Sequence, residues 1–465
     1  MKRIMKWTLV LSVTLFTGWF FLSGCTIVQT VSHGVKTMSS RVDPDYDQLE
    51  KSRSSGLVKS GNTVTGAGNV ANEFSGLEPY WTGFRGPGTA GTYAEQQIQT
   101  DWPEAGPTLL WKQPCGGGYG SFAVANGMAF TFEQRREKEA LVAYDLATGA
   151  EIWVMEYEDR FNEMMSGEGP RSTPTFGGDR VYSLGANGRL HAVDPQSGSV
   201  IWQRDVLNDT ASKNLDYGVA ASPLYYDEKV YVVGGKSPSN DCVFAYNAAS
   251  GELVWSALPE NMTYVSPMLY QPSGAKSPHL LVNSSTRLVG MNPQDGEELW
   301  TSPWKIMNGM TCSQPLALDN SRLLVSGGYG AGAKLIQVGK KDGRWAVAQL
   351  WKNNRMKTKF NAGVIHDGHV YGLDEGILAC LNIESGKRIW KGGRFGYGQV
   401  ILAEGHLICT TEKGDLVLVK ATPESFQELC RIPLFDGTTW NVPALAHGLL
   451  LLRNPKEMAC FDLRL

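Results

Sequence analysis

Cysteine, histidine and serine are the residue types in this chain that most often carry chemistry, and their spacing gives little support for an enzyme. The eight cysteines include no adjacent pair and no C-x-x-C, so neither a redox dithiol nor a c-type haem attachment is predicted. No G-x-S-x-G nucleophile motif occurs. His366 and His369 stand three residues apart in a predicted turn, where solvated side chains are more common than zinc ligands. We therefore predict no catalytic, cofactor-binding or metal-ligating residue.

Cys25 is the exception, because its surroundings predict a covalent modification. A basic N-terminus precedes an uncharged apolar stretch at 7–22, which is typical of a secretory signal and too short for a spanning helix. Leu-Ser-Gly-Cys at 22–25 resembles a bacterial lipobox, which implies cleavage before Cys25 and its lipidation. Thr26, in place of Asp, favours the outer over the inner membrane. The alternative is an ordinary cleaved signal with an incidental cysteine.

A repeated turn organises most of the chain. The stretch VDPQSGSVIW, which ends at Trp202, is typical of two strands joined by a tight turn, in which Gly198 accepts a positive φ. The turn glycines follow one another at intervals of 43 to 53 residues, a period typical of propellers or solenoids. Further copies of the stretch, one of them degraded, end at Trp153, Trp255, Trp300, Trp351 and Trp390.

The repeat predicts the fold class and the number of units. Each unit contains four short strand candidates, which indicates one four-stranded antiparallel sheet. The third strand recurs eight times, and the eighth copy, 457–463, has no fourth strand after it. A spare strand with Trp111 lies at 109–114. We predict an all-β fold, an eight-bladed β-propeller of four-stranded antiparallel blades, closed into a ring by this N-terminal strand, which protects both edges.

The tryptophans of the repeat share one predicted role, docking each blade on its neighbour. A small residue stands at the matching third-strand position in most copies, with Gln337 and Leu418 as exceptions. Cys380 and Cys460 occupy this position, so we expect them to be buried apolar residues. The disulfide status of the seven cysteines other than Cys25 stays open. The docking tryptophans are Trp111, Trp153, Trp202, Trp255, Trp300, Trp351 and Trp390.

Composition divides the chain into four predicted regions. Residues 1–24 form the signal peptide, and 25–78 form the lipidated cysteine with a flexible tether rich in Ser, Gly and Asn. Residues 79–108 form a Gly/Pro-rich ordered loop that packs on the propeller, because its large aromatic residues would be costly to expose. The propeller itself spans 109–465.

The turn-plus-tryptophan repeat, the eight blades and the lipoprotein signal resemble the bacterial PQQ-like β-propeller repeat family, in its BamB-like branch. FRGPGTAG and DWPEAGPTLLW upstream, and KFNAGVIHDGHVYGLD downstream, resemble the same branch. The resemblance implies a monomeric, lipid-anchored scaffold of the cell envelope, in the outer membrane and facing the periplasm. Its partners would be an envelope protein or unfolded chains. The net charge of −3 gives no excess of positive charge for binding nucleic acid, so we expect no nucleic-acid partner.

Two other functions stay open. The family also contains quinoprotein dehydrogenases, which hold PQQ against a ring of two adjacent disulfide-bonded cysteines and beside calcium. This chain lacks adjacent cysteines, and Glu168, Asn361 and Asn441 could supply calcium ligands only if the fold brings them together. If the protein is a scaffold, we therefore expect no cofactor. PQQ with calcium is expected only if the protein is a quinoprotein dehydrogenase. The second alternative is a sensor of small molecules or glycans at the channel mouth.

The predicted binding site lies on one face of the propeller. With strands A to D from centre to rim, the A–B and C–D turns share one face, and the B–C and D–A loops share the other. The repeated turn is C–D, so the irregular loops, which more often carry function, lie on the opposite face. Basic residues there could favour an anionic ligand or an acidic peptide end, whereas Ser and Asn could simply satisfy backbone groups. The channel-mouth candidates that enter the A strands are Arg171, Ser172, Ser222, Ser266, Ser313, Lys359, Phe360, Asn361, Arg394, Tyr397, Gln399, Trp440 and Asn441.

Overall fold

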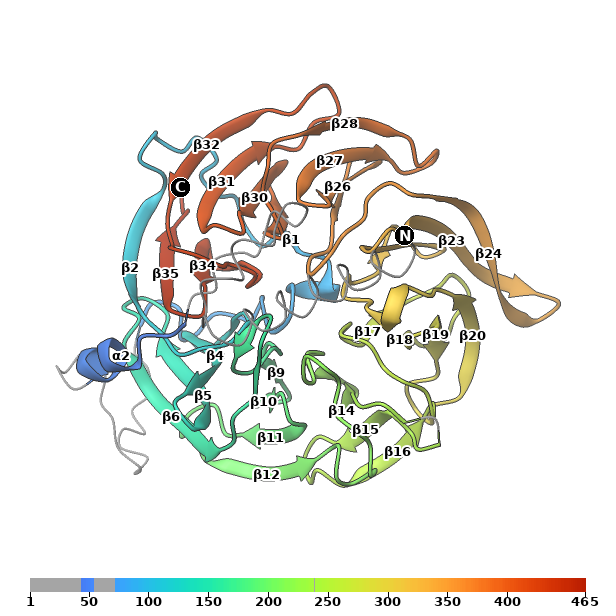
Figure 1. The fold of residues 1–465 in the computed structure, drawn as a ribbon, viewed down its shortest axis with the longest axis horizontal. Coiled ribbons are helices and arrows are strands. Elements are labelled where there is room, and N and C mark those ends of the chain that lie inside the picture. The colour runs from blue at the N-terminus through green and yellow to red at the C-terminus, as the bar shows by residue number, and fades with distance from the viewer. Residues whose placement is uncertain (1–42, 54–71, 238) are drawn as a thin grey trace, which may run out of the picture. The chain divides into compact units, whose positions relative to one another are not determined.

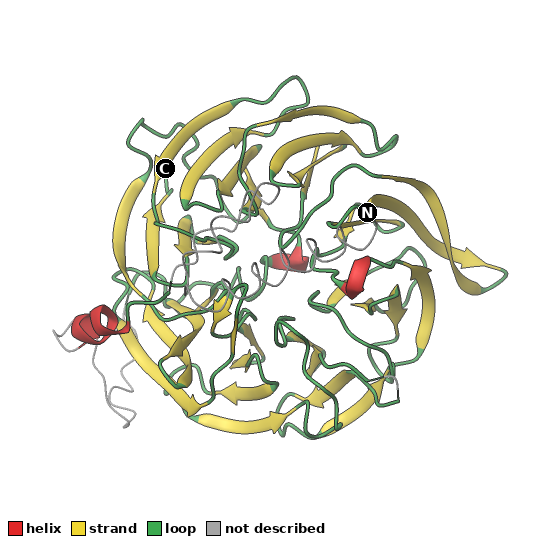
Figure 2. Ribbon diagram, in the orientation of Figure 1, coloured by secondary structure: helices red, strands yellow, loops and turns green. Residues whose placement is uncertain are grey.

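The repeats form a ring of eight sheets around a common axis (Figure 1). The computed structural model describes residues 43–53, 72–237 and 239–465. In seven blades four consecutive strands pair antiparallel in chain order, from strand A at the centre to strand D at the rim. Strands dominate, and helix is confined to short pieces (Figure 2). The predicted eight-bladed all-β propeller is confirmed, while the signal peptide and Cys25 lie outside the described residues.

The first four blades follow the chain without interruption. Blade 1 is β3 (Ala123–Ala125), β4 (Met128–Arg135), β5 (Lys138–Asp145) and β6 (Glu151–Glu158). Blade 2 is β9 (Thr175–Gly177), β10 (Arg180–Leu184), β11 (Arg189–Val193) and β12 (Val200–Asp205). Blade 3 is β13 (Leu224–Tyr226), β14 (Lys229–Val233), β15 (Val243–Asn247) and β16 (Leu253–Ala257). Blade 4 is β17 (Met268–Tyr270), β18 (His279–Asn283), β19 (Arg287–Met291) and β20 (Glu298–Pro303).

The last four blades complete the ring. Blade 5 is β21 (Leu316–Ala317), β22 (Arg322–Gly327), β23 (Gly332–Lys341) and β24 (Arg344–Asn353). Blade 6 is β25 (Val364–His366), β26 (His369–Asp374), β27 (Ile377–Asn382) and β28 (Arg388–Gly392). Blade 7 is β29 (Gln399–Ala403), β30 (His406–Thr410), β31 (Asp415–Lys420) and β32 (Glu428–Pro433). Blade 8 is β33 (Ala444–Ala446), β34 (Leu449–Arg453), β35 (Glu457–Asp462) and the N-terminal β2 (Thr108–Pro114).

Strand β2 closes the ring as the sequence predicted. It pairs antiparallel with β35, and Trp111 lies opposite Cys460. Blade 8 therefore joins the two ends of the described propeller, and its outer strand comes from far away in the sequence. The pairing covers the edge of β35 that would otherwise be open to another chain.

The repeated turn has a local cause that the blades share. In blade 2 the Asp194 carboxylate accepts hydrogen bonds from the backbone N–H groups of Gln196 and Ser197, which fixes the turn. Gly198 then adopts φ 73°, and a Cβ on it would lie 2.8 Å from the Trp153 ring of blade 1. Glycine is thus required there by both the backbone conformation and the neighbouring indole.

The repeated tryptophans dock neighbouring blades. The indole N–H of six of them donates to a backbone carbonyl in the next blade around the ring, at Leu146, Pro195, Ala248, Pro293, Ile383 and Thr422. Trp300 instead donates to His279 of its own blade, because the degraded turn of blade 5 lies at the tip of a long β23–β24 hairpin that extends past the ring (Figure 1). The residue opposite Trp351 is Leu335 rather than Gln337, a correction to the predicted register.

The first part of the segment 79–108 packs at the centre of the ring, a place that the sequence did not predict, whereas Pro103 and Gly106 lie against the outermost strand of blade 7. The backbone of this first part accepts hydrogen bonds from innermost strands of several blades: from Val124 in blade 1, Phe176 in blade 2 and Leu402 in blade 7. Strand β1 (Thr92–Tyr93) pairs parallel with β29, so the blade 7 sheet has five strands. The short helix η2 (Pro87–Thr89) lies near the axis, in light blue in Figure 1.

The prediction that residues 25–78 form a flexible tether is wrong for part of this segment. Residues Tyr46–Ser52 form helix α2, capped by the Asp45 side chain, and Leu49 of this helix is buried. Phe74 is buried as well and stacks on His447. These apolar side chains are isolated within a polar stretch, so composition did not reveal that each has a docking place on the propeller. None of the helices among the described residues is long and apolar enough to cross a bilayer.

The seven described cysteines are free thiols, and all except the half-buried Cys312 are buried. Cys380 and Cys460 lie opposite Trp390 and Trp111, which confirms their place in the packing of the blades.

Candidate binding site at the loop-rich face

A belt of hydrogen bonds links the entries of the innermost strands. The backbone N–H of Ser121 donates to the hydroxyl of Thr173, Thr173 donates in the same way to Ser222, and Ser222 to Ser266. The Ser172 hydroxyl, fully buried, donates to the Leu184 carbonyl. For these predicted site residues the structure favours the simpler interpretation: they satisfy backbone groups and join blades 1 to 4.

In blades 5 to 8, amide side chains replace the hydroxyls at the same level. The NH₂ groups of these amides donate to backbone carbonyls, for example from Gln399 to Phe360 and Trp440, 2.9 and 2.8 Å away. Their carbonyl oxygens have no hydrogen-bond partner among the described residues. A buried acceptor without a donor is costly, so these four oxygens are unsatisfied acceptors in the described structure. The four amides are Gln314, Asn361, Gln399 and Asn441, all at most 4 % exposed.

Aromatic rings from several blades meet beside these amides. The Lys359 ammonium lies 4.6, 5.1 and 4.4 Å from the ring centroids of Tyr329, Phe360 and Tyr397. Phe360 also contacts Trp440, with ring centroids 5.1 Å apart. We call Lys359 and its three rings the lysine cage. Its members belong to the B–C loop of blade 5 and to the D–A loops on either side of blade 6, so they lie on the predicted face.

Two cations at this place lack a carboxylate partner. No ion pair joins Lys359 to any carboxylate in the described part of the chain, and the same holds for Arg85. Arg85 is fully buried at the ring centre, where it donates to carbonyls that include Gly363, 2.8 Å away, and Val400. Burial lowers the pKa of Arg85 to about 10, so it is still charged at neutral pH. Neither cation forms an ion pair within the described ranges, and the nearby Glu412 carboxylate accepts a hydrogen bond from the Trp440 indole instead.

The predicted basic residues differ in what they do. Arg171 donates to the carbonyls of Gly167 and Gly169 in its own loop, and its guanidinium lies over the rings of Phe161 and of Tyr119. Its loop carries the small hairpin β7 (Asn162–Glu163) and β8 (Gly167–Glu168). Arg394 is exposed on the D–A loop that follows blade 6. Of the predicted cations, only Lys359 sits in the cage.

Sequence reasoning missed several residues of this cluster. Arg85 lies in the FRGPGTAG motif, for which the sequence predicts only a packed loop. The Gly363 carbonyl that accepts its hydrogen bond is 278 residues away. Tyr329 and Gln314 lie in the degraded blade 5, where the repeat gives little guidance. The only available signal was that Arg85 is a charged residue within an otherwise Gly/Pro-rich loop.

A buried carboxylate lies between blades 1 and 2, also at the loop-rich side. Glu139 accepts hydrogen bonds from the Tyr157 hydroxyl and from the backbone N–H of Ala186, while Tyr157 packs on His191 with ring centroids 4.5 Å apart. Burial raises the pKa of Glu139 to about 7, and it lowers the pKa of His191 to about 4. Both side chains are therefore largely or partly neutral near pH 7.

A second charged cluster lies on the rim, where β2 joins blades 8 and 1. Arg135 donates to Glu133 and Glu151, 3.1 and 2.8 Å away, and Arg53, just after α2, donates to Glu151 at 3.1 Å. We call these residues with Tyr144 the closure seam. Burial alone would raise the pKa of Glu133, but Arg135 and Arg453 outweigh it and hold that pKa below its usual value.

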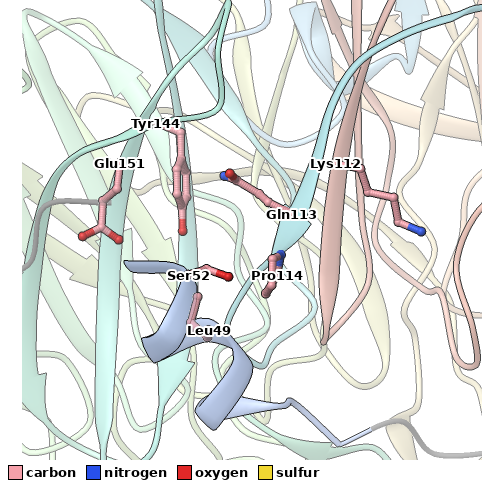
Figure 3. A pocket seen from close by; sticks show the side chains of 7 residues that line it. All are labelled: Leu49, Ser52, Lys112, Gln113, Pro114, Tyr144 and Glu151. Atoms are coloured by element: carbon pink, nitrogen blue, oxygen red, sulfur yellow. The ribbon is translucent and has the colours of Figure 1, made fainter. Parts of the chain in front are cut away.

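A small cavity of about 170 Å³ separates α2 from the closure seam. Figure 3 shows Leu49 and Ser52 of α2 on one side and Tyr144 and Glu151 on the other. β2 contributes Lys112, Gln113 and Pro114 to the lining. The cavity is too small for most ligands, and the carboxylates beside it are already paired, so we place the candidate site at the lysine cage instead.

The residues considered for calcium do not form a site. The Glu168 carboxylate is engaged by the Tyr46 hydroxyl and by Arg160. Asn361 donates to the Lys359 carbonyl in its own loop, and Asn441 donates to the Gly120 carbonyl beside blade 1. In the described ranges no group of three or more His, Cys, Asp or Glu side chains is arranged to hold a metal ion. With no adjacent cysteines either, the residues present do not fit PQQ held by calcium as in the quinoproteins.

The fold and the docking tryptophans define a class, the β-propellers built from PQQ-like repeats. Within that class, the chain belongs to the family of the outer membrane protein assembly factor BamB, whose family model matches residues 137–392. It is 24 % identical over 253 residues to BamB of Moranella endobia, and 24 % identical over 263 residues to BamB of Yersinia pestis. Each match covers 53 % of this chain and 63 % of the relative, so less than two thirds of either relative is matched.

Solved structures show the same fold. BamB from Moraxella catarrhalis superimposes with a TM-score of 0.54 at 14 % identity, over 77 % of this chain and 99 % of that one. A quinohemoprotein alcohol dehydrogenase from Comamonas testosteroni gives a TM-score of 0.60 at 10 % identity, over 84 % and 81 % of the two chains. At such low identity both likenesses concern the fold alone.

Proposed function

We propose that this protein is a lipid-anchored scaffold of the bacterial cell envelope that takes part in the assembly of outer-membrane proteins. Its loop-rich face would present the lysine cage and the neighbouring loops to a partner protein or to an unfolded chain. Membership of the BamB family carries this proposal. The residues of the loop-rich face support it, because unpaired cations, open amide oxygens and aromatic rings suit the binding of polypeptide better than catalysis.

The proposal is tested in cells that lack this protein. We expect their outer membranes to contain less β-barrel protein, and the wild-type gene to restore the level. A photoreactive amino acid at Arg394, on the loop-rich face, should cross-link to an envelope protein. The same probe at Lys387, an exposed position on the repeated-turn face of the same blade, should give little product. Normal barrel levels in the deletion strain, with no cross-link from Arg394, would contradict the proposed role.

The quinoprotein alternative has a direct test. Purified protein mixed with PQQ and calcium should show no change in the quinone absorbance if it is a scaffold. A stoichiometric spectral change would restore the enzyme as the better proposal.

The membrane anchor is tested at Cys25, which lies outside the described residues. Cys25→Ser should leave a precursor without lipid that partitions into the aqueous phase of a detergent extraction. Correct processing of this variant with full recovery in the detergent phase would show that Cys25 is not the anchor.

A further inference from the structure

The centre of the loop-rich face combines three features that a ligand would have to match. The first is the half-buried ammonium of Lys359, which has no ion pair among the described residues, whereas the fully buried Arg85 nearby in the ring is held by carbonyls. A partly desolvated cation is costly unless it is paired, and ring faces replace an anion only in part. The electrostatic complement of this place is therefore an anionic group.

The second feature is a pair of hydrogen-bond acceptors beside the cations. Asn361 donates to the Lys359 carbonyl and Gln399 to the Phe360 carbonyl, so both amides are held against the backbone of the lysine cage. Their own oxygens, Oδ1 and Oε1, are buried and have no partner among the described residues. An anion alone cannot satisfy these oxygens, because they need a donor such as a peptide N–H.

The third feature is the closed far side of the ring. Segment 79–98 contacts innermost strands of blades 1, 2, 7 and 8, and Tyr93 and Glu95 bind the backbone of the A–B turn of blade 8 at His447 and Gly448. This segment lies at the ring centre on the A–B turn side, so a chain end at the lysine cage matches the site better than a strand threaded through the ring.

From these features we propose that the lysine cage binds the free C-terminal carboxylate of a polypeptide whose last side chain is apolar. The carboxylate pairs with Lys359, a backbone N–H of the last residues donates to the oxygen of Asn361 or Gln399, and the last side chain packs on Phe360, Tyr397 or Trp440. This inference deepens the proposed function, on which it rests, by naming the part of a client or partner chain that is recognised.

The test compares two short peptides of one sequence ending in leucine, one a free acid and the other a C-terminal amide. Binding to the purified protein is followed by calorimetry and by the fluorescence of the tryptophans, which include Trp440 beside Phe360. We expect the free acid to bind roughly tenfold or more tightly than the amide, the factor for loss of one charge-assisted pair. Equal affinity of the two peptides would overturn the proposal.

Variants locate the effect. Lys359→Met keeps an apolar stem against the rings and should remove the preference for the free acid, whereas Lys359→Arg should keep it. The matched control is Lys413→Met, because Lys413 is exposed on the same face, in the B–C turn of blade 7. It should bind like the wild type. A preference that survives in Lys359→Met, with its thermal unfolding unchanged, would place the carboxylate elsewhere and overturn the assignment.

Two further outcomes decide the ligand class. Inorganic phosphate should compete weakly, since it offers no N–H donor and no apolar side chain. If phosphate displaces the peptide completely at equal concentration, the site is a general anion site and the proposal fails. A failed peptide experiment together with reduced barrel assembly in the deletion strain would refute this subsite alone and leave the assembly function standing.

Discussion

The closure seam and the lysine cage both contain charged side chains, but they balance the charge differently. At the closure seam, Arg135 lies between two carboxylates, and Glu151 also binds Arg53. At the lysine cage, Lys359 has three rings around it and no carboxylate, and the amide oxygens nearby are open. In the closure seam every charge has a partner within the fold, so the cluster stabilises ring closure. In the lysine cage the ammonium has no carboxylate partner among the described residues, so we place ligand binding there.

The largest expected effect is on stability, at the closure seam. Arg135→Met leaves two buried carboxylates with less compensation, and we expect a loss of about 3–5 kcal/mol in the free energy of unfolding, measured by chemical denaturation. The matched control is the next residue, Arg136→Met, whose exposed guanidinium pairs with Asp47 and Glu50 and should matter much less. Equal losses for the two variants would show that pairing at the seam is not what stabilises closure.

Two tryptophans distinguish a role in stability from a role in binding. Trp202 is buried between blades 2 and 3, so Trp202→Ala should cost about 3–5 kcal/mol and lower the melting temperature markedly. Trp440 is half-buried and donates to Glu412 at 3.0 Å. Trp440→Ala should lower melting less while weakening peptide binding, as calorimetry of both variants would show. If Trp440→Ala destabilises as much as Trp202→Ala and binding is unchanged, Trp440 belongs to the core.

The smallest expected effect concerns a buried carboxylate that has hydrogen-bond donors but no ion pair. Because the pKa of Glu139 is raised to about 7 in the folded state and is about 4.3 in the unfolded state, only the unfolded state ionises between these values. The free energy of unfolding should therefore fall as pH rises through this window, and level off above it. Stabilisation from the protonated acid is complete at low pH and lost near neutrality.

Glu139→Gln mimics the protonated acid at every pH. Relative to the wild type, the variant should gain about 2–3 kcal/mol of stability between roughly pH 5 and pH 8, since each pKa unit corresponds to about 1.4 kcal/mol. Denaturation curves at the two pH values measure this difference. A stability difference that does not change with pH would mean that Glu139 ionises normally and that its hydrogen bonds with Tyr157 and Ala186 hold a charged group.

The architecture can be predicted from the amino-acid sequence alone. The turn around Gly198 and the tryptophan that follows recur with a period set by one blade, and every hairpin forms between strands adjacent in the chain. The turn and the docking tryptophan of each blade therefore appear as a repeat in the sequence, and the number of copies predicts the number of blades. The count also left β35 without its outer partner, which identified β2 as the closing strand.

Which residues of the loop-rich face come together is visible only in the folded ring. The lysine cage draws its members from different loops, and Arg85 reaches Gly363 across 278 residues, so these contacts have no period and no local motif. For the same reason the sequence does not predict the docking of α2 or the placement of 79–98 at the ring centre. One buried side chain such as Leu49 or Trp81 does not mark its partner in the sequence. Periodic contacts can be predicted from one chain, whereas single long-range contacts depend on the shape that the completed ring presents.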